Sequence, residues 1–324
     1  MSAVLVTGGA GYTGGHLCRY LAGRGLRVRT LALPESDTGA LVQAGIEPVI
    51  GDLTQPETLD AAVRDVETVY HIAAVYREEN VPRRLFFDVN VGGTRNLIEA
   101  SMKAGVKRFV HCSTVGVQGD IENPPATEEA PYRPGDHYQE SKMEGEMLAL
   151  RYYKEKGAPI AVFRPVGIYG PGDTRFLKLF RNVRKPMIGS GNVLYHLTYI
   201  DDLVEGIRLV GETPGIEGQI FTLAGPRYTT LNELYAAIAA VLDTKPSRIR
   251  IPVWPFLAAG AICESVCRPL RISPPIYRRR VDFFVKDRAF DIARARRVLG
   301  YDPKIDLAEG LGRTAAWYKE QGLL

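Results

Sequence analysis

The sequence predicts an α/β protein in which helices cover both faces of a doubly wound parallel sheet, with a smaller, mainly helical C-terminal lobe. Short β-branched runs alternate with amphipathic stretches through the first half of the chain, and a glycine-rich turn follows the first run. Beyond Pro165 this alternation ends. A chain of 324 residues with 45% hydrophobic content can bury the core that such a fold requires.

The first domain, residues 1–165, consists of repeated βαβ units. Each unit needs a right-handed crossover to return the chain to the sheet in a parallel direction. Hydrophobic periodicity predicts strands at 3–6, 27–32, 47–50, 67–73, 107–112 and 159–163. Helices are predicted at 12–23, 56–64, 85–104 and 138–156.

The second region, residues 166–324, has a different pattern. Glycines and prolines interrupt any regular alternation as far as Tyr199, which predicts a loop-rich segment. The run at 219–223 predicts a strand that returns to the sheet of the first domain, so the two regions interleave. From Thr230 onward the pattern is mainly helical, with a proline-rich interruption at 252–275.

Charge and cysteine content exclude several classes of protein. Lys plus Arg number 41 and Asp plus Glu 37, a balance too even to predict nucleic-acid binding. The cysteines are sparse and predict reduced thiols. They are Cys18, Cys112, Cys263 and Cys267. The last two are one helical turn apart, but no further ligand lies near them, so we expect core residues and no metal site.

The chain enters an apolar strand directly after Met1, without the pattern of a signal peptide, and we therefore expect a cytoplasmic protein. The most apolar later stretch, 251–263, has about 13 residues, too few for the ~20 that span a bilayer. Contact with a membrane surface stays open. Trp254 and its apolar neighbours in this stretch are expected to pack in the core of the lobe.

The glycine-rich turn lies between the first predicted strand and the first predicted helix. Such a turn needs unusual backbone angles, close approach of the backbone to a ligand, and close packing of helix on strand, and Gly8, Gly11 and Gly14 can meet these demands. The N–H groups that open the helix then face a pyrophosphate. The sequence predicts a Rossmann-type dinucleotide site; the alternative is a turn without a ligand.

Asp52 ends the third strand, where a carboxylate can accept a hydrogen bond from adenine, although it can also cap the helix that follows. The second strand ends in Thr30-Leu31-Ala32-Leu33-Pro34, with neither an acid for the ribose nor an arginine for a 2′-phosphate. We expect NAD, with NADP not excluded.

Tyr138 and Lys142 are four residues apart, so they share one face of a helix. A nearby ammonium favours the phenolate and lowers the pKa of a tyrosine, which makes it a better acid or base at neutral pH. Ser113 and Thr114 end the fifth strand and supply hydroxyls at the carboxyl edge of the sheet, where ligands bind. Together with the glycine turn, these groups predict hydride transfer at a carbinol carbon.

These motifs, in this order, resemble the extended short-chain dehydrogenase/reductases over nearly the whole chain. The matching stretches are Thr7-Gly8-x-x-Gly11-x-x-Gly14, Asp52-Leu53, His71-x-Ala73-Ala74, Asn90-Val-x-Gly93-Thr94, Ser113-Thr114, Tyr138-x-x-x-Lys142, Arg164-Pro165 and Tyr199-Ile200-Asp201-Asp202.

The resemblance implies roles for further residues. Counting back from Gly119 puts the catalytic hydroxyl on Thr114, with Ser113 as the second candidate. Asn90 is implied to support a proton relay or the helix beside it. The implied cofactor-binding set is Gly8, Gly11, Tyr12, Thr13, Gly14, Asp52, Leu53, Ala73, Ala74, Asn90, Lys142 and Pro165. The helices at 85–104 and 138–156 are implied to form a homodimer interface.

Two departures argue against a nucleotide-sugar substrate. Such relatives typically have an Arg-Asp pair ahead of the strand at Thr198, where this chain has Tyr195-His196-Leu197, and an Asn where Gly167 lies. Stretches at 251–257 and 290–292 instead resemble the 3β-hydroxysteroid and sterol-carboxylate dehydrogenase branch. Arg280, with its two neighbouring arginines, can still clamp a diphosphate or lie on a solvated helix face.

The sequence thus predicts an NAD(P)-dependent oxidoreductase that interconverts a secondary alcohol and a ketone on a bulky small molecule. The substrate contacts are expected at Thr114, Tyr138, Gly167, His196 and Arg280, although His196 also suits a purely structural role. One alternative is a nucleotide-sugar epimerase or dehydratase with tightly bound NAD. The remote alternative is a non-catalytic protein that senses the cofactor.

Overall fold

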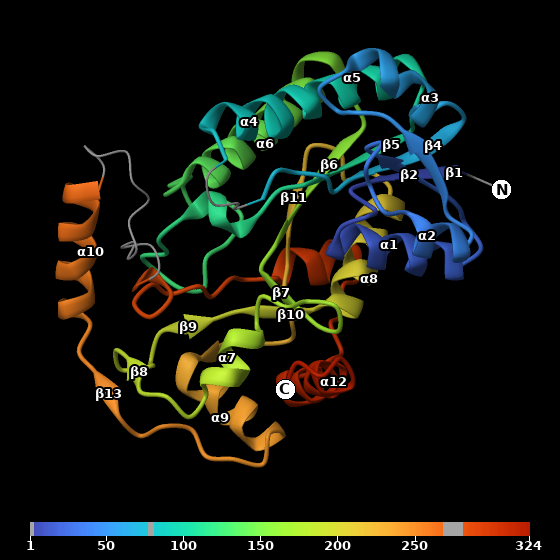
Figure 1. The fold of residues 1–324 in the computed structure, drawn as a ribbon. Helices are drawn as coiled ribbons and strands as arrows, with labels where there is room; N and C mark the ends of the chain where they lie inside the picture. Colours follow the sequence, from blue (N-terminus) through green and yellow to red (C-terminus); the bar gives the residue numbers. More distant parts are fainter. Residues whose placement is uncertain (1–2, 77–80, 268–280) are drawn as a thin grey trace.

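The computed structural model describes residues 3–76, 81–267 and 281–324. Its centre is a seven-stranded sheet in the order β11-β6-β5-β4-β1-β2-β3, with neighbouring strands parallel (Figure 1). The strands are β1 (Ala3–Thr7), β2 (Arg27–Ala32), β3 (Glu47–Ile50), β4 (Val66–His71), β5 (Arg108–Cys112), β6 (Ile160–Pro165) and β11 (Ile220–Leu223).

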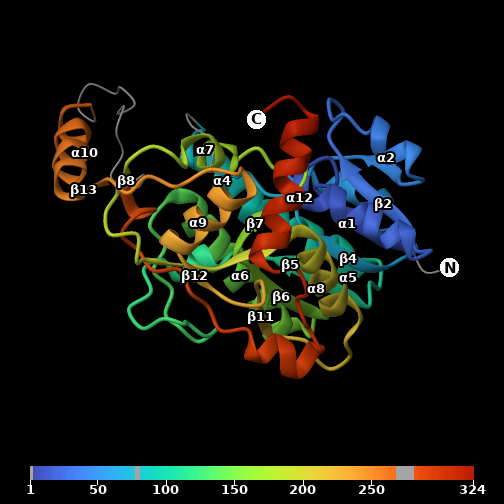
Figure 2. The ribbon, with the colours of Figure 1, turned by 90° about the horizontal axis from the view of Figure 1, so that it is seen from below.

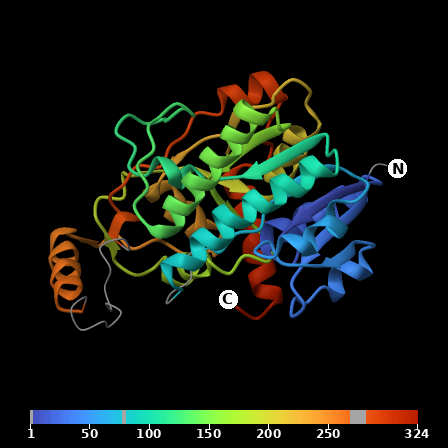
Figure 3. The same ribbon diagram turned by 90° about the horizontal axis from the view of Figure 1, so that it is seen from above.

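Helices cover both faces of this sheet. One face carries α3 (Leu59–Val63, after the short turn Pro56–Thr58), α4 (Arg83–Phe87), the π-helical segment η2 (Asp88–Gly93), α5 (Thr94–Lys103) and α6 (His137–Lys156). Figure 3 shows α5 and α6 side by side over the sheet. The other face carries α1 (Tyr12–Gly23) and α8 (Ile200–Glu212), while α2 (Gly39–Gln43) lies before β3.

Alternation of side chains along β1 explains the two layers. Ala3 and Leu5 point into a core shared with α3, α5 and α6, whereas Val4 and Val6 point into a core shared with α1 and α8. All four side chains are buried, as expected for an inner strand of a parallel sheet. The strand order reverses direction between β1 and β4, and the crevice at the carboxyl ends there is the usual ligand position in such sheets.

The C-terminal lobe lies beyond the carboxyl ends of the strands (Figure 2). Its elements are β7 (Gly167–Tyr169), α7 (Leu177–Asn182), β8 (Met187–Ile188), β9 (Leu194–Tyr195), β10 (Leu197–Tyr199), β12 (Thr229–Thr230), α9 (Leu231–Val241), β13 (Arg250–Ile251), α10 (Trp254–Cys267), η4 (Ala295–Leu299) and α12 (Leu307–Glu320). Helix α12 packs against α9, and α10 stands apart from the other elements of the lobe.

The predicted sheet is confirmed, including the late strand near 219–223, which is β11 beside β6. Two local predictions were wrong. The proline-rich interruption expected at 252–275 begins instead as helix α10, because Pro255 falls in the first turn, where a helix tolerates proline. Trp254 is not a core residue, since 72% of it is exposed.

The helix expected at 85–104 is helical throughout but not regular. Its middle, at Asp88–Gly93, is π-helical, a local widening that periodicity cannot reveal. The segment includes Asn90, whose position is described below.

Candidate functional site

The glycine turn joins β1 to α1 with little space for side chains. Gly8 has φ +77°, and a Cβ there would lie 2.9 Å from the backbone nitrogen of Ala73. A Cβ on Gly14 would lie 2.1 Å from the carbonyl oxygen of Gly8. No side chain caps the start of α1 at Gly11, so the N–H groups of its first turn are available to an anionic ligand.

A cavity of about 590 Å³, which we call the glycine cavity, opens above this turn. Its lining brings together most of the predicted cofactor-binding residues: Gly8, Gly11, Tyr12, Thr13, Gly14, Ala73, Ala74 and Pro165. The Tyr12 hydroxyl is buried and has no hydrogen-bond partner among the described residues. The backbone cradle at Gly8 and the open helix start fit a bound dinucleotide.

Four predicted cofactor residues lie outside the lining of the glycine cavity: Asp52, Leu53, Asn90 and Lys142, the last of which is described below with α6. Asp52 accepts hydrogen bonds from the N–H and hydroxyl of Thr54, at 2.8 and 2.9 Å, so one carboxylate oxygen serves a local turn. Leu53 is buried in the core that the sheet shares with α3, α5 and α6. Asn90 accepts from the N–H of Val75 at 2.8 Å and donates to the hydroxyl of Ser141 at 2.9 Å, which ties the segment after β4 to α6.

His71, at the end of β4, holds the neighbouring loop against the glycine turn. The Thr94 hydroxyl donates to the Asn90 carbonyl, so it accepts from Nε2–H of His71 at 2.9 Å, and Nδ1 then accepts from Thr7. The Thr7 oxygen also accepts the N–H groups of residues 72 and 73. Burial, with a smaller contribution from Lys142, lowers the pKa of His71 to about 3.

Helix α6 carries the predicted acid/base pair. The Asp136 carboxylate accepts from the N–H of Gln139 at 2.8 Å and caps the helix immediately before Tyr138. Lys142 is buried, with 2% of its surface exposed. Burial lowers the pKa of Lys142, while Cys112 and Glu146 favour its charged form. The Tyr138 ring meets the ring of Tyr76 edge to face, with centroids 5.0 Å apart.

The two candidate hydroxyls differ in their surroundings. The Thr114 Oγ1 accepts from the N–H of Gly116 at 3.1 Å, capping η3 (Val115–Gln118), and its own hydrogen is left for another acceptor. The Ser113 hydroxyl is buried and has no partner among the residues described. Both residues line the glycine cavity.

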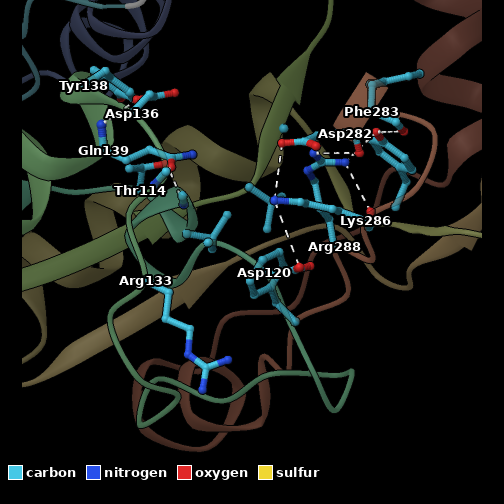
Figure 4. A pocket seen from close by; sticks show the side chains of 18 of the residues that line it. Thr114, Asp120, Arg133, Asp136, Tyr138, Gln139, Asp282, Phe283, Lys286 and Arg288 are labelled. Atoms are coloured by element: carbon cyan, nitrogen blue, oxygen red, sulfur yellow. Dashed lines mark hydrogen bonds and ion pairs between the residues drawn. The ribbon is translucent and has the colours of Figure 1, made fainter. Parts of the chain in front are cut away.

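A second cavity of about 390 Å³, the outer cavity, adjoins the first. The two cavities share five lining residues: Tyr76, Thr114, Tyr138, Val166 and Gly167. In Figure 4, Thr114, Asp136, Tyr138 and Gln139 gather on one side of the outer cavity, and Asp120, Asp282, Phe283, Lys286 and Arg288 on the other. The predicted catalytic tyrosine and threonine therefore lie where the two cavities meet.

Of the other predicted substrate contacts, Gly167 lines both cavities. His196 lines neither, and its two ring nitrogens face the carbonyl oxygens of Phe290 and Gly225 at 3.1 and 3.0 Å. These contacts match the structural role and not the expected substrate contact. Arg280 lies outside the described residues.

The structure adds residues that the sequence did not single out. Tyr76 follows β4 at the carboxyl edge, so its position after a strand was a usable signal. Lys286 and Arg288 come from a segment with no motif, and only the tertiary fold brings them to the outer cavity.

Two further properties concern only residues 3–76, 81–267 and 281–324. We find there no group of three or more potential metal-binding side chains. No helix in these ranges has the length and apolar character that crossing a bilayer requires.

Comparison with known proteins shows that the sequence is similar to that of known enzymes. A model of the NAD dependent epimerase/dehydratase family matches residues 4–224. The 3-beta-hydroxysteroid dehydrogenase of Mycolicibacterium neoaurum is 31% identical, over 99% of this chain and 92% of its own. The decarboxylating sterol-4-alpha-carboxylate 3-dehydrogenase of Schizosaccharomyces pombe is 32% identical, over 98% of this chain and 97% of its own.

Solved structures have the same fold. The crystal structure of gox2253 superposes with a TM-score of 0.87 at 27% identity, over the whole of both chains. The dTDP-glucose 4,6-dehydratase DesIV of Streptomyces venezuelae, solved with NAD and TYD bound, has a TM-score of 0.78 at 25% identity, over 98% of this chain and 97% of that one.

Proposed function

The chain belongs to the NAD dependent epimerase/dehydratase family and is an NAD-dependent enzyme, and from this premise we propose that it interconverts a secondary alcohol and a ketone on a bulky substrate. The proposed activity is similar to that of 3β-hydroxysteroid and sterol dehydrogenases, the relatives at 31% and 32% identity. The observation that carries the proposal is that Tyr138 and Thr114 line both cavities. An alcohol in the outer cavity can thus meet these hydroxyls beside the cofactor.

In this proposal the glycine turn and α1 hold the pyrophosphate, and Ala73, Ala74 and Pro165 line the rest of the glycine cavity. Bound NAD supplies the nicotinamide that takes the hydride from the carbinol carbon. Tyr138 takes the proton of the substrate hydroxyl, and Thr114 donates a hydrogen bond to the same oxygen. The positive charge of Lys142, one turn along α6, favours the phenolate of Tyr138.

The size and the aromatic lining of the outer cavity favour a bulky substrate. Tyr195, Phe283 and Phe290 supply aromatic surface, and a volume of about 390 Å³ lies within the range of cavities that enclose small organic ligands. Val166 and Gly167 continue the wall toward Tyr138. Nucleotide-sugar enzymes commonly have an Asn at the position of Gly167, so this wall lacks the polar side chain that they have.

A second candidate is a nucleotide-sugar epimerase or dehydratase, in which the hydride returns to the substrate. The cationic side chains of the outer cavity favour it, since a diphosphate needs such groups. The two candidates differ in net cofactor turnover. A dehydrogenase accumulates reduced cofactor, whereas an epimerase converts UDP- or dTDP-sugars without a change at the absorbance band of NADH.

Tyr138→Phe tests the proposal. With 3β-hydroxysteroids and NAD, we expect reduced cofactor to appear with the wild type and the rate to fall at least ~10²-fold in the variant, because general acid/base catalysis typically contributes that much. NAD affinity, measured by calorimetry, should change little. Tyr153→Phe, an exposed tyrosine of the same helix, is the matched control. Full activity of Tyr138→Phe would refute the assignment.

A further inference from the structure

Three cationic side chains line the outer cavity, and two of them already have carboxylate partners. Arg133 forms an ion pair with Glu122. Lys286 lies 3.3 Å from a carboxylate oxygen of Asp282 and 4.0 Å from one of Asp120. Arg288 has no carboxylate within 4.0 Å among the described residues. Although Asp120, Asp136 and Asp282 also line the cavity, Arg288 is the cation of this lining for which the described residues provide no ion pair.

All hydrogen-bond partners of the Arg288 guanidinium are neutral oxygens. Nη1 donates to the hydroxyl of Tyr195 at 2.7 Å and to the carbonyl of Lys286 at 3.2 Å, and Nη2 donates to the carbonyl of Asp282 at 3.2 Å. Burial raises the pKa of Tyr195, so this phenol stays uncharged at physiological pH. None of the three contacts neutralises the guanidinium.

Two donors of Arg288 remain for a ligand. A guanidinium has five N–H groups, and the three bonds above leave Nε–H and one N–H of Nη2 without an acceptor among the described residues. These are the two nitrogens with which Arg164 of this chain grips both carboxylate oxygens of Glu146. Arg288 thus keeps one unused donor on each of the two nitrogens with which an arginine can bind a carboxylate or phosphate.

The backbone holds Arg288 firmly beside the cavity. Its N–H donates to the carbonyl of Leu194 in β9 at 2.8 Å, and the N–H of Leu194 donates to the Asp287 carboxylate at 2.7 Å. Figure 4 shows Arg288 on the side of the cavity opposite Tyr138 and Thr114. Its charge is therefore placed to meet a group remote from the reacting carbinol.

We propose that Arg288 binds an acidic group, a carboxylate or phosphate, at the end of the substrate remote from the carbinol carbon. This inference rests on the proposed function and narrows it: the substrate is an acidic alcohol with an apolar body. The aromatic walls at Tyr195, Phe283 and Phe290 contact that body, and Arg288 selects against neutral analogues of the same shape.

The test compares one acid with its neutral ester. The wild type should oxidise 3β-hydroxy-5-cholenoic acid with a kcat/KM at least about tenfold higher than that for the methyl ester, as expected for a charge-assisted hydrogen bond. In Arg288→Gln, kcat/KM for the acid should fall to the value for the methyl ester, while kcat/KM for the ester should stay unchanged. Arg296→Gln removes an exposed arginine of the same C-terminal region that also bonds a carbonyl, and should retain the preference.

Thermal unfolding of each variant separates loss of recognition from loss of fold. If Arg288→Gln does not fold, Arg288→Lys is the variant to test. The lysine ammonium keeps the positive charge but cannot form two parallel hydrogen bonds, so the preference for the acid over the ester should drop several-fold. Equal kcat/KM for acid and ester in the wild type, or an unchanged preference in a folded Arg288 variant, would overturn the inference while leaving the dehydrogenase proposal intact.

Oxidation of neither steroid by the wild type would count against the proposed function, and a second comparison then tests Arg288 alone. UDP should bind the wild type at least about tenfold more tightly than uridine in calorimetry, and Arg288→Gln should abolish the difference. That result would assign the acidic group to a diphosphate. Equal binding of UDP and uridine would overturn the inference for this source as well.

Discussion

At the scale of single residues, His71 shows how the fold fixes a protonation state. A second proton would sit on Nδ1, facing the Thr7 oxygen, whose lone pairs already accept two backbone N–H groups. Protonation would also place a charge in a fully buried position near Lys142. The neutral imidazole is thus part of the support under residues 72 and 73, which border the glycine turn.

This arrangement predicts acid sensitivity. Below about pH 6.5 the unfolded chain protonates His71, whereas the folded protein does so only near pH 3. The unfolded state then binds more protons, so the free energy of unfolding falls as the pH drops, by about 2 kcal/mol between pH 6.5 and 5 for this residue. Urea denaturation of the wild type and of His71→Gln at pH 7 and 5 measures the difference.

His71→Gln should be less stable than the wild type at pH 7, since it disturbs the bonds to Thr7 and Thr94, but should lose less stability on acidification. The exposed His137→Gln is the control for loss of an imidazole. A His71→Gln variant with the full pH dependence of the wild type would contradict a neutral His71. Residual dependence is expected, because burial also lowers the pKa of His111.

The site residues that sequence could predict are those that local chain geometry dictates. Gly8 and Gly14 are required by a strand, a turn and a helix within a dozen residues, and Tyr138 and Lys142 by one turn of a helix. Arg288 could not be predicted, because its place depends on pairing with β9, far away in sequence. His196 was misjudged as a substrate contact because adjacency to a strand does not show which way a ring points.

At the scale of elements, the contact between β1 and α1 sets how closely the helix start approaches a ligand. Both Gly14 and Gly23 belong to α1. A Cβ at Gly14 would collide with the backbone of Gly8, whereas nothing lies within 4 Å of a Cβ at Gly23. The same substitution at the two ends of one helix should therefore have opposite effects.

Gly14→Ala should destabilise the protein and abolish measurable NAD binding, because the helix must move away from the turn. Gly23→Ala should raise stability by about 0.5–1 kcal/mol and leave NAD affinity unchanged, since alanine restricts the unfolded chain and suits a helix better. Thermal unfolding with calorimetric titration of NAD measures both. Normal NAD affinity in Gly14→Ala would mean that close packing at this turn is dispensable.

Most elements of the first domain were predicted from their patterns, whereas the regular helix α8 in the second region was not predicted. The β-branched runs and the 20-residue helix α6 follow directly from their patterns. Helix α10 was missed because its two prolines, Pro252 and Pro255, were taken as breakers although both lie at or before its first turn. The π-helical segment around Asn90 depends on side-chain bonds to Val75 and Ser141, which a local pattern does not contain.

At the scale of the whole molecule, the outer surfaces of α4, α5 and α6 support the predicted homodimer. Exposed apolar side chains lie on all three helices: Leu85, Met102 and Met147, the last with 48% of its surface exposed. Figure 3 shows α5 and α6 forming the upper layer of the molecule, facing the viewer. Paired copies of this layer would cover the exposed apolar groups.

Met147→Glu tests this assembly. We expect the wild type to sediment as a dimer and the variant to shift toward monomer, because two buried carboxylates would face each other across a two-fold interface. Val42→Glu, at an exposed apolar position on α2, is the control and should sediment like the wild type. A monomeric wild type would refute the prediction.

The position of β11 has a consequence for biosynthesis. During translation, β6 leaves the ribosome well before the strand that pairs with its outer edge, since all elements from β7 to α8 lie between them. Until residue 223 has emerged, the nascent chain presents an unpaired edge of buried apolar residues, a surface that invites aggregation or chaperone capture. The dinucleotide-binding domain therefore cannot complete its sheet until the part of the chain between β6 and β11 has been synthesised.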